Sequence, residues 1–335
     1  TVLIITKSND TLSKKLYVKT RNKNGVVELD QTLTFSDIVI DDKVVYNPIS
    51  HRVLVPTFFN QYKTGGIYTG RLSVKLFNED FTATTSETPL VNYSDRNVHV
   101  PCVKELSNGN FVVIWFGDGG GTYLQKYMVI LSPTLEVIAN VSISSSSDYP
   151  FIYIQEHNNY LYVIYYSSSL QNIYKYTLSG GYVDTISMTA PQALSGLGIP
   201  GESSRYAILG LKNGTTAIYL SRLDLETGQY SGTIQLDTSA VFNSIKKLQD
   251  GLNAVCWRTT NVSNYYSKYL IFDNNLNYMG SGIKSVSTGS SAYTNDIAGY
   301  SDGSYLYGYS VYPSYNSYYS IKAYDAISLT VNQPA

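Results

Sequence analysis

Few residues of this sequence have the types and spacing that catalysis requires. The 3 His, at positions 51, 99 and 157, are too scattered to predict a shared zinc site or a catalytic triad. The 2 Cys, Cys102 and Cys256, lie far apart and form no CxxC pair, so we expect buried free thiols. No HExxH motif and no phosphate-binding loop is present.

The acidic residues also lack the spacing of a known site. Asp41, Asp42 and Asp118 do not form the Asp-x-Asp-x-Asp-Gly pattern of a calcium loop. A glycosidase needs two carboxylates that face each other across the scissile bond, and sequence spacing identifies no such pair. We therefore predict no catalytic residue, no metal ligand and no cofactor. A structural calcium ion, held by separate parts of the chain, is the alternative.

Composition narrows the class of protein. The 335 residues carry 24 Lys and Arg against 25 Asp and Glu, so the near-neutral chain lacks the basic charge of a nucleic-acid-binding protein. Hydrophobic residues make up 43%, which favours a folded core, but the longest apolar run, Tyr160 to Tyr166, is too short to insert into a membrane. The 33 Tyr and abundant Ser, Thr and Asn are typical of extracellular, cell-surface or virion-surface proteins. Because the chain begins at Thr1, we expect a trimmed part of a longer protein.

One cassette recurs along the chain. It begins with a two-residue turn whose two central positions, as at Asn108 and Gly109, favour positive φ, followed six residues later by an aromatic residue at the end of an apolar strand. A second strand then carries Tyr-x-x-Lys/Arg. The turn and aromatic pairs are Gly109 and Trp115, Asn159 and Tyr165, Gly251 and Trp257, and Gly303 and Tyr309. The cations are Arg71, Lys126, Arg222, Lys268 and Lys322, which we expect to lie on outer strands with their stems on the tyrosine rings.

The period of the cassette predicts the fold. Copies begin near residues 2, 53, 111, 161, 206, 253 and 305, so the mean period is about 50 residues. We therefore predict an all-β, seven-bladed β-propeller with four-stranded antiparallel blades, formed by residues 1–335 as one domain. Innermost strands are expected near residues 38–47, 97–106, 150–156, 193–200, 241–248 and 293–300. The first copy lacks such a strand, which either residues 328–332 or residues upstream of Thr1 would supply, and pairing of the two chain ends would close the ring.

One copy resembles a known repeat. The string LSNGNFVVIWFGDGGGTYLQKY, from Leu106 to Tyr127, resembles a repeat of secreted bacterial adhesin-like proteins. The resemblance implies an extracellular propeller and no particular activity. Residues 116–123 also resemble part of the Asp-box of sialidases, but without its serine. We interpret that segment as a Gly-rich hairpin.

The candidate ligand-binding residues lie in loops. In a propeller, the loops between second and third strands and those between blades emerge on one face, where rigid sheets support them. Tyrosine there can stack on a sugar ring or anchor a protein, and charged neighbours add directional hydrogen bonds. We assign to this face Tyr62, Asp95, Arg96, Asp118, Asp148, Tyr149, Glu202, Arg205, Tyr293, Tyr312 and Tyr315.

Three functions remain open from the sequence. The first is a non-catalytic extracellular or surface binding and adhesion module that recognises a glycan or a surface protein. The second is a polysaccharide-cleaving enzyme, a glycosidase or lyase, with carboxylates at the propeller axis. The third is a structural subunit of a cell-surface or virion assembly that packs against copies of itself. We expect the first, because no catalytic constellation accompanies the tyrosine-rich loops.

Overall fold

The computed structural model describes most of the chain. The described residues are 2–7, 14–21, 27–39, 43–63, 67–118, 125–144, 151–167, 171–188, 193–199, 204–213, 217–248, 252–259, 266–278, 282–287, 292–299, 305–311 and 320–323. Among them, no helix is long and apolar enough to cross a membrane.

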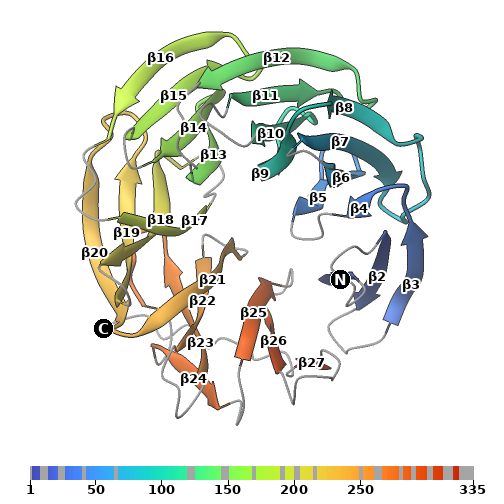
Figure 1. The fold of residues 1–335 in the computed structure, drawn as a ribbon. Helices are drawn as coiled ribbons and strands as arrows, with labels where there is room; N and C mark the ends of the chain where they lie inside the picture. The colour runs from blue at the N-terminus through green and yellow to red at the C-terminus, as the bar shows by residue number, and fades with distance from the viewer. Residues whose placement is uncertain are drawn as a thin grey trace. The chain divides into compact units, whose positions relative to one another are not determined.

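The described strands form seven small antiparallel sheets, which confirms the predicted all-β class (Figure 1). Sheet A contains β1 (Val2–Lys7), β2 (Lys15–Arg21) and β3 (Val27–Thr34); sheet B contains β4 (Ile38–Val39), β5 (Val45–Asn47), β6 (Arg52–Lys63), β7 (Ile67–Asn78) and β8 (Thr88–Tyr93). Sheet C contains β9 (Asn97–Glu105), β10 (Phe111–Asp118), β11 (Lys126–Leu131) and β12 (Val137–Ser144); sheet D contains β13 (Phe151–His157), β14 (Tyr160–Tyr166), β15 (Gln171–Thr177) and β16 (Tyr182–Ser187). Sheet E contains β17 (Ala193–Ile199), β18 (Tyr206–Asn213), β19 (Ala217–Asp224) and β20 (Tyr230–Asp237). Sheet F contains β21 (Ala240–Lys247), β22 (Leu252–Thr259), β23 (Tyr266–Asp273) and β24 (Lys284–Ser287), and sheet G contains β25 (Ala292–Gly299), β26 (Tyr305–Val311) and β27 (Ser320–Ala323).

The predicted first strands agree closely with the structure for sheets C to G. They are β9, β13, β17, β21 and β25, each within a residue or so of its expected bounds. The expected strand at 38–47 is instead two short pieces, β4 and β5, which both pair with β6. The tail that we expected to close a ring, residues 328–332, lies outside the described residues.

The chain divides into two compact units. One contains Leu3–Arg21 and Val27–Thr185, and the other contains Thr1–Val2, Asn22–Val26 and Ile186–Ala335.

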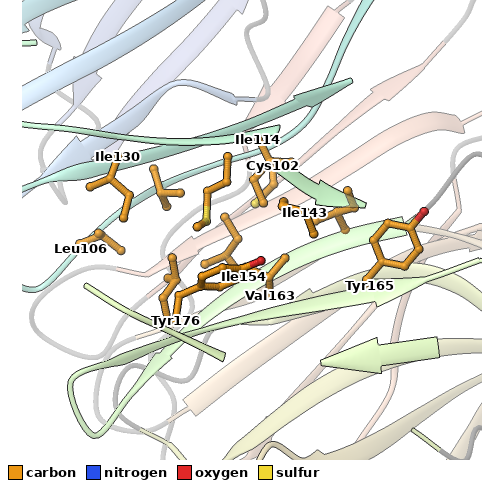
Figure 2. Close-up of a cluster of buried hydrophobic side chains, with 13 residues drawn as sticks. Cys102, Leu106, Ile114, Ile130, Ile143, Ile154, Val163, Tyr165 and Tyr176 are labelled. Atoms are coloured by element: carbon orange, nitrogen blue, oxygen red, sulfur yellow. The ribbon is translucent and has the colours of Figure 1, made fainter. Parts of the chain in front are cut away.

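In the first unit, consecutive sheets pack face to face through apolar side chains. Figure 2 shows the core between sheets C and D, where Ile114 and Ile130 meet Ile154 and Val163, with Cys102 beside them. Similar cores join sheet A to sheet B and sheet B to sheet C. The strands of sheets B and C are apolar on both faces because each of these sheets is covered on both sides, which explains their near-continuous hydrophobic runs.

The second unit is built in the same way. Sheets E and F enclose a core that includes Leu220, Val255, Leu270 and the completely buried Trp257. The first strands β17, β21 and β25 lie next to one another, as β9 and β13 do in the first unit. Each unit therefore stacks its sheets with their first strands adjacent.

Several turns hold large side chains in left-handed backbone geometry. In sheets B, C and F, the turn between third and fourth strands places Phe81, Leu135 and Leu276 at φ of 61°, 66° and 67°. Non-glycine residues rarely adopt this conformation. These three side chains are buried in the cores between sheets, and their burial offsets the strain.

The first turn of the cassette differs from its expected form. At Asn108 and Gly109 the turn is longer than two residues, since the Leu106 amide donates to the Asn110 carbonyl, and only Gly109 has positive φ. A two-residue turn with positive φ at both positions occurs instead at Asn158 and Asn159.

The cations of the Tyr-x-x-Lys/Arg pattern lie on third strands, not on the outermost ones. Arg71 pairs with both carboxylate oxygens of Asp37, and Arg222 lies 4.2 Å from the ring of Tyr206 on the neighbouring strand. Lys126 is buried, with its ammonium 5.6 Å from the Tyr165 ring. For these cations, the aromatic or acidic partner therefore comes from outside their own motif.

Candidate functional site

The structure gives side chains for only some of the predicted site residues. The side chains of Asp95, Arg96 and Arg205 are described. Tyr62, Asp118 and Tyr293 lie in strands β6, β10 and β25, of which we describe only the backbone at these positions. Asp148, Tyr149, Glu202, Tyr312 and Tyr315 lie outside the described residues.

Topology brings three of the predicted segments together. Within sheets B and C, the β6–β7, β8–β9 and β10–β11 connections emerge at the same end, which we call the loop end. Tyr62 pairs with Tyr68 across the β6–β7 hairpin, and Asp118 pairs with Asn97, the residue after Arg96. The Tyr62 hairpin, the Asp95–Arg96 pair and Asp118 therefore meet at the loop end.

Two residues of the hairpin position the β8–β9 connection. The Asn60 side chain donates to the Val98 carbonyl at 2.9 Å and accepts from the Val98 amide at 2.8 Å. Its cross-strand partner is Gly70, where an added Cβ would lie 2.7 Å from both the Arg96 carbonyl oxygen and the Val98 nitrogen. Only a residue without a side chain fits at Gly70, so the backbone that carries Arg96 rests directly on sheet B.

The β6–β7 hairpin extends beyond this contact. Its two strands have 12 residues each, whereas no other described strand exceeds 9. Three residue pairs follow Asn60 and Gly70, up to Lys63 and Ile67, so the hairpin projects about 10 Å past the Arg96 backbone. The hairpin is therefore the longest strand pair among the described residues at the loop end.

The side chain of Arg96 is fixed on several sides. Its Nε and Nη2 atoms each donate to one oxygen of Asp95 at 3.0 Å. The guanidinium carbon lies 5.1 Å from the Tyr93 ring, and the aliphatic stem lies against Gly117. The hydrogen bonds from Arg96 lower the pKa of the Asp95 carboxyl, and Asp95 raises the pKa of Arg96. We call Tyr93, Asp95, Arg96 and Gly117 the Arg96 site.

Behind the Arg96 site, Trp115 joins sheets B and C. Its indole N–H donates to the Tyr93 hydroxyl at 3.3 Å, and its ring stacks on Tyr127. Sequence analysis identified the recurring position of Trp115 but missed Tyr93 and Asn60. Neither belongs to a motif, and Tyr93 lies 22 residues before its partner in another copy of the cassette.

The second unit repeats this indole contact with a different acceptor. Trp257 of sheet F donates to Asp237, the last residue of β20 in sheet E, at 3.1 Å. Lys268 donates to the same carboxylate oxygen at 2.7 Å. Burial acts to raise the pKa of Asp237, but the hydrogen bonds from Lys268 and Trp257 outweigh it, so the pKa is lowered. The cassette Trp is thus a structural residue in both units.

The position of Arg205 differs from the prediction. It precedes β18, between the first and second strands of sheet E, and so lies at the end opposite the second-to-third-strand connection. There it donates to both oxygens of Asp224 at 2.7 to 3.0 Å and also contacts Glu226. Arg205 therefore joins two turns of its own sheet, and Glu202 belongs to the same connection along the chain.

Three other kinds of candidate residue are possible metal ligands, the cysteines and a serine motif. In the described part of the chain, no three His, Cys, Asp or Glu side chains are close enough to hold a metal ion. Cys102 and Cys256 are buried free thiols, as predicted, and burial raises the pKa of Cys102 to about 11. A Gly-x-Ser-x-Gly string at 299–303 lies along the chain between the antiparallel strands β25 and β26. A nucleophile elbow instead joins a strand to a helix.

Comparison with known proteins identifies the fold. No family model and no curated protein matches the chain. Among solved structures, a candidate 6-phosphogluconolactonase from Bacteroides fragilis matches with a TM-score of 0.53 and 12% identity, over 98% of this chain and 94% of that one. The WD40 domain of SCAP from fission yeast matches with a TM-score of 0.47 and 9% identity, over 96% and 83% of the two chains. A subtype N10 neuraminidase-like protein of A/little yellow-shouldered bat/Guatemala/060/2010 gives 0.45 and 8%, over 77% and 94%. The match to the lactonase, a β-propeller, shows a propeller-like fold alone.

Proposed function

We propose that this chain is a non-catalytic binding module, extracellular or at a cell or virion surface, that recognises a glycan or a surface protein. The observation that supports the proposal is the meeting of Tyr62, Asp95, Arg96 and Asp118 at the loop end of sheets B and C. These residues come from three different connections, and all four were candidates on sequence grounds.

The physical character of the Arg96 site suits binding. The Asp95 carboxylate and the Tyr93 ring hold the guanidinium in place, so little side-chain entropy is lost when a ligand binds. Asn60 and Gly70 fix the backbone beneath it. A preformed polar group beside a projecting, tyrosine-bearing hairpin is a common arrangement for recognition.

We further propose that the seven sheets are blades of one seven-bladed propeller. The count of sheets in the described residues and the adjacent first strands within each unit support this. The period of about 50 residues in the sequence is that of a four-stranded blade. In this arrangement the tyrosine-rich connections of every blade would emerge on the face that carries the Arg96 site.

The binding proposal is tested with an array of glycans and candidate surface proteins. We expect the wild-type chain to bind at least one class of ligand and Arg96→Ala to weaken that binding about tenfold or more. Arg205→Ala is the matched control, because Arg205 also pairs with a carboxylate but lies in a first-to-second-strand connection. Equal losses in both variants, or no binding by the wild-type chain, would contradict the proposal.

The same experiment separates the other two functions. Release of shorter saccharides during incubation would favour a polysaccharide-cleaving enzyme. Assembly of the chain into stable oligomers without any ligand, measured by light scattering, would favour a structural subunit.

A further inference from the structure

We infer that the Arg96 site takes a neutral saccharide with neighbouring hydroxyl groups in preference to an acidic one. This inference rests on the proposed binding function and names its ligand class. It is carried by the charge and the hydrogen-bonding groups that the structure places together at the loop end.

The first argument is charge. At the loop end, the charged side chains that the structure describes are Asp95, Arg96 and Lys126, and Lys126 is completely buried. The two accessible charges cancel, because Asp95 neutralises Arg96 through two hydrogen bonds. Arg71, further along β7, is likewise paired with a carboxylate. An anionic ligand would therefore find no excess positive charge at this site.

The second argument is the number of hydrogen-bonding groups that remain. A guanidinium has five N–H donors, and Arg96 uses two of them on Asp95. Its Nη1 atom has no partner among the described residues, and the side chain is 30% exposed. The Asp95 side chain is 62% exposed, and each carboxylate oxygen retains a lone pair. The pair thus presents donors and acceptors side by side.

A saccharide with neighbouring hydroxyls matches this arrangement. Each hydroxyl can both donate and accept, so one can accept from Arg96 while the next donates to Asp95. A carboxylate can only accept, and beside Asp95 it would meet a like charge. The same Asp95 that positions Arg96 therefore selects against an acidic ligand.

The hairpin adds groups of the same kind. Gln61 is exposed, and the hydroxyl of its partner Thr69 donates to the Gln61 carbonyl. Tyr62 and Tyr68 follow as the next cross-strand pair, and tyrosine is a residue type that packs on the apolar face of sugars. Apart from Lys63 at its far end, this part of the hairpin is uncharged.

The first experiment compares two sets of oligosaccharides of equal length by isothermal titration calorimetry. One set is neutral, derived from mannan and glucan, and the other is derived from polyuronate. We expect the wild-type chain to bind a neutral oligosaccharide about tenfold or more tightly than any uronate, with little change between about 0.05 and 0.5 M salt. Tighter binding of a uronate would overturn the inference.

The second experiment uses Asp95→Asn, which keeps the size of the side chain but leaves the charge of Arg96 uncompensated. We expect neutral oligosaccharides to bind more weakly and uronates to gain about tenfold or more. Asp184→Asn is the matched control, because Asp184 is an exposed carboxylate in the middle of β16. Unchanged melting temperatures would show that both variants fold.

The outcomes distinguish the inference from the function on which it rests. If the wild-type chain binds a surface protein through Arg96 but no saccharide, or if Asp95→Asn leaves the order of ligands unchanged, the inference is wrong and the binding function stands. If no ligand of either class binds, the binding function fails as well.

Discussion

Replacing Asp237 with Ala should destabilise the protein far more than replacing Asp95. Asp237 accepts hydrogen bonds from the Trp257 indole at 3.1 Å and the Lys268 ammonium at 2.7 Å, and its side chain is 13% exposed. The Ala variant leaves both donors without this acceptor. Breaking a fully buried ion pair costs about 3–5 kcal/mol. Because Lys268 is 22% exposed and regains some water, we expect about 2–3 kcal/mol.

Urea unfolding followed by tryptophan fluorescence measures this cost, since Trp257 is one of only 2 Trp in the chain. The control is Asp95→Ala, which removes an ion pair whose carboxylate is 62% exposed, and it should cost about 0–1 kcal/mol. If the two variants lose the same free energy of unfolding, the contact of Asp237 with Trp257 and Lys268 does not join sheets E and F as we argue.

The pH dependence of the same contact follows from the sign of its pKa shift. The folded-state pKa of Asp237 is lowered, because its hydrogen bonds to Lys268 and Trp257 outweigh burial. Its contribution to stability is therefore fully present above the ordinary aspartate pKa, about 3.9, and is lost as the pH falls toward the lowered value. We expect the difference between wild type and Asp237→Asn to be constant from about pH 8 to pH 5 and to shrink below about pH 4.

Three further predictions concern packing. In Gly117→Ala, the new Cβ meets the Cδ atom of Arg96, so we expect ligand binding to fall about tenfold while the melting temperature changes little, as measured by calorimetry. Leu276 is buried at φ 67°, so Leu276→Gly should be about 1 kcal/mol more stable than Leu276→Ala in urea unfolding; the opposite order would show that the turn is not strained. Cys102 and Cys256 are buried, and burial raises the pKa of Cys102 to about 11, so a thiol reagent at about pH 7.5 should react with both only after unfolding.

The strands of this protein could be predicted from the sequence because turns and apolar runs recur at a regular distance. The expected strand at 193–200 corresponds to β17, Ala193–Ile199, and the expected strand at 150–156 to β13, Phe151–His157. The strand expected at 38–47 corresponds instead to the short β4 and β5, and the described residues 43 and 44 between them are not part of a strand. A regular repeat predicts where each strand lies. It cannot predict a departure from the pattern in a single copy.

The contacts between sheets could not be predicted in the same way. Trp115 and Trp257 occupy the same position of the cassette, but one donates to the Tyr93 hydroxyl and the other to the Asp237 carboxylate. Their acceptors lie 22 and 20 residues earlier, at the end of the preceding sheet, and share no residue type. Both acceptors are oxygen atoms that accept a hydrogen bond from a buried indole N–H. A search for identical residues does not detect this shared feature.

The positions that repeat and the positions that we propose to bind a ligand are different sets. The cassette Trp residues are buried, and its cations Arg71, Lys126 and Lys268 contact residues of their own or neighbouring sheets. The proposed site lies where one copy departs from the others, at the lengthened β6–β7 hairpin. Repeated residues must satisfy the packing that every sheet requires, whereas a lengthened connection is free of that requirement. In a repeat protein of this kind, we therefore expect a strand pair longer than its counterparts to be a better guide to a binding site than the repeat itself.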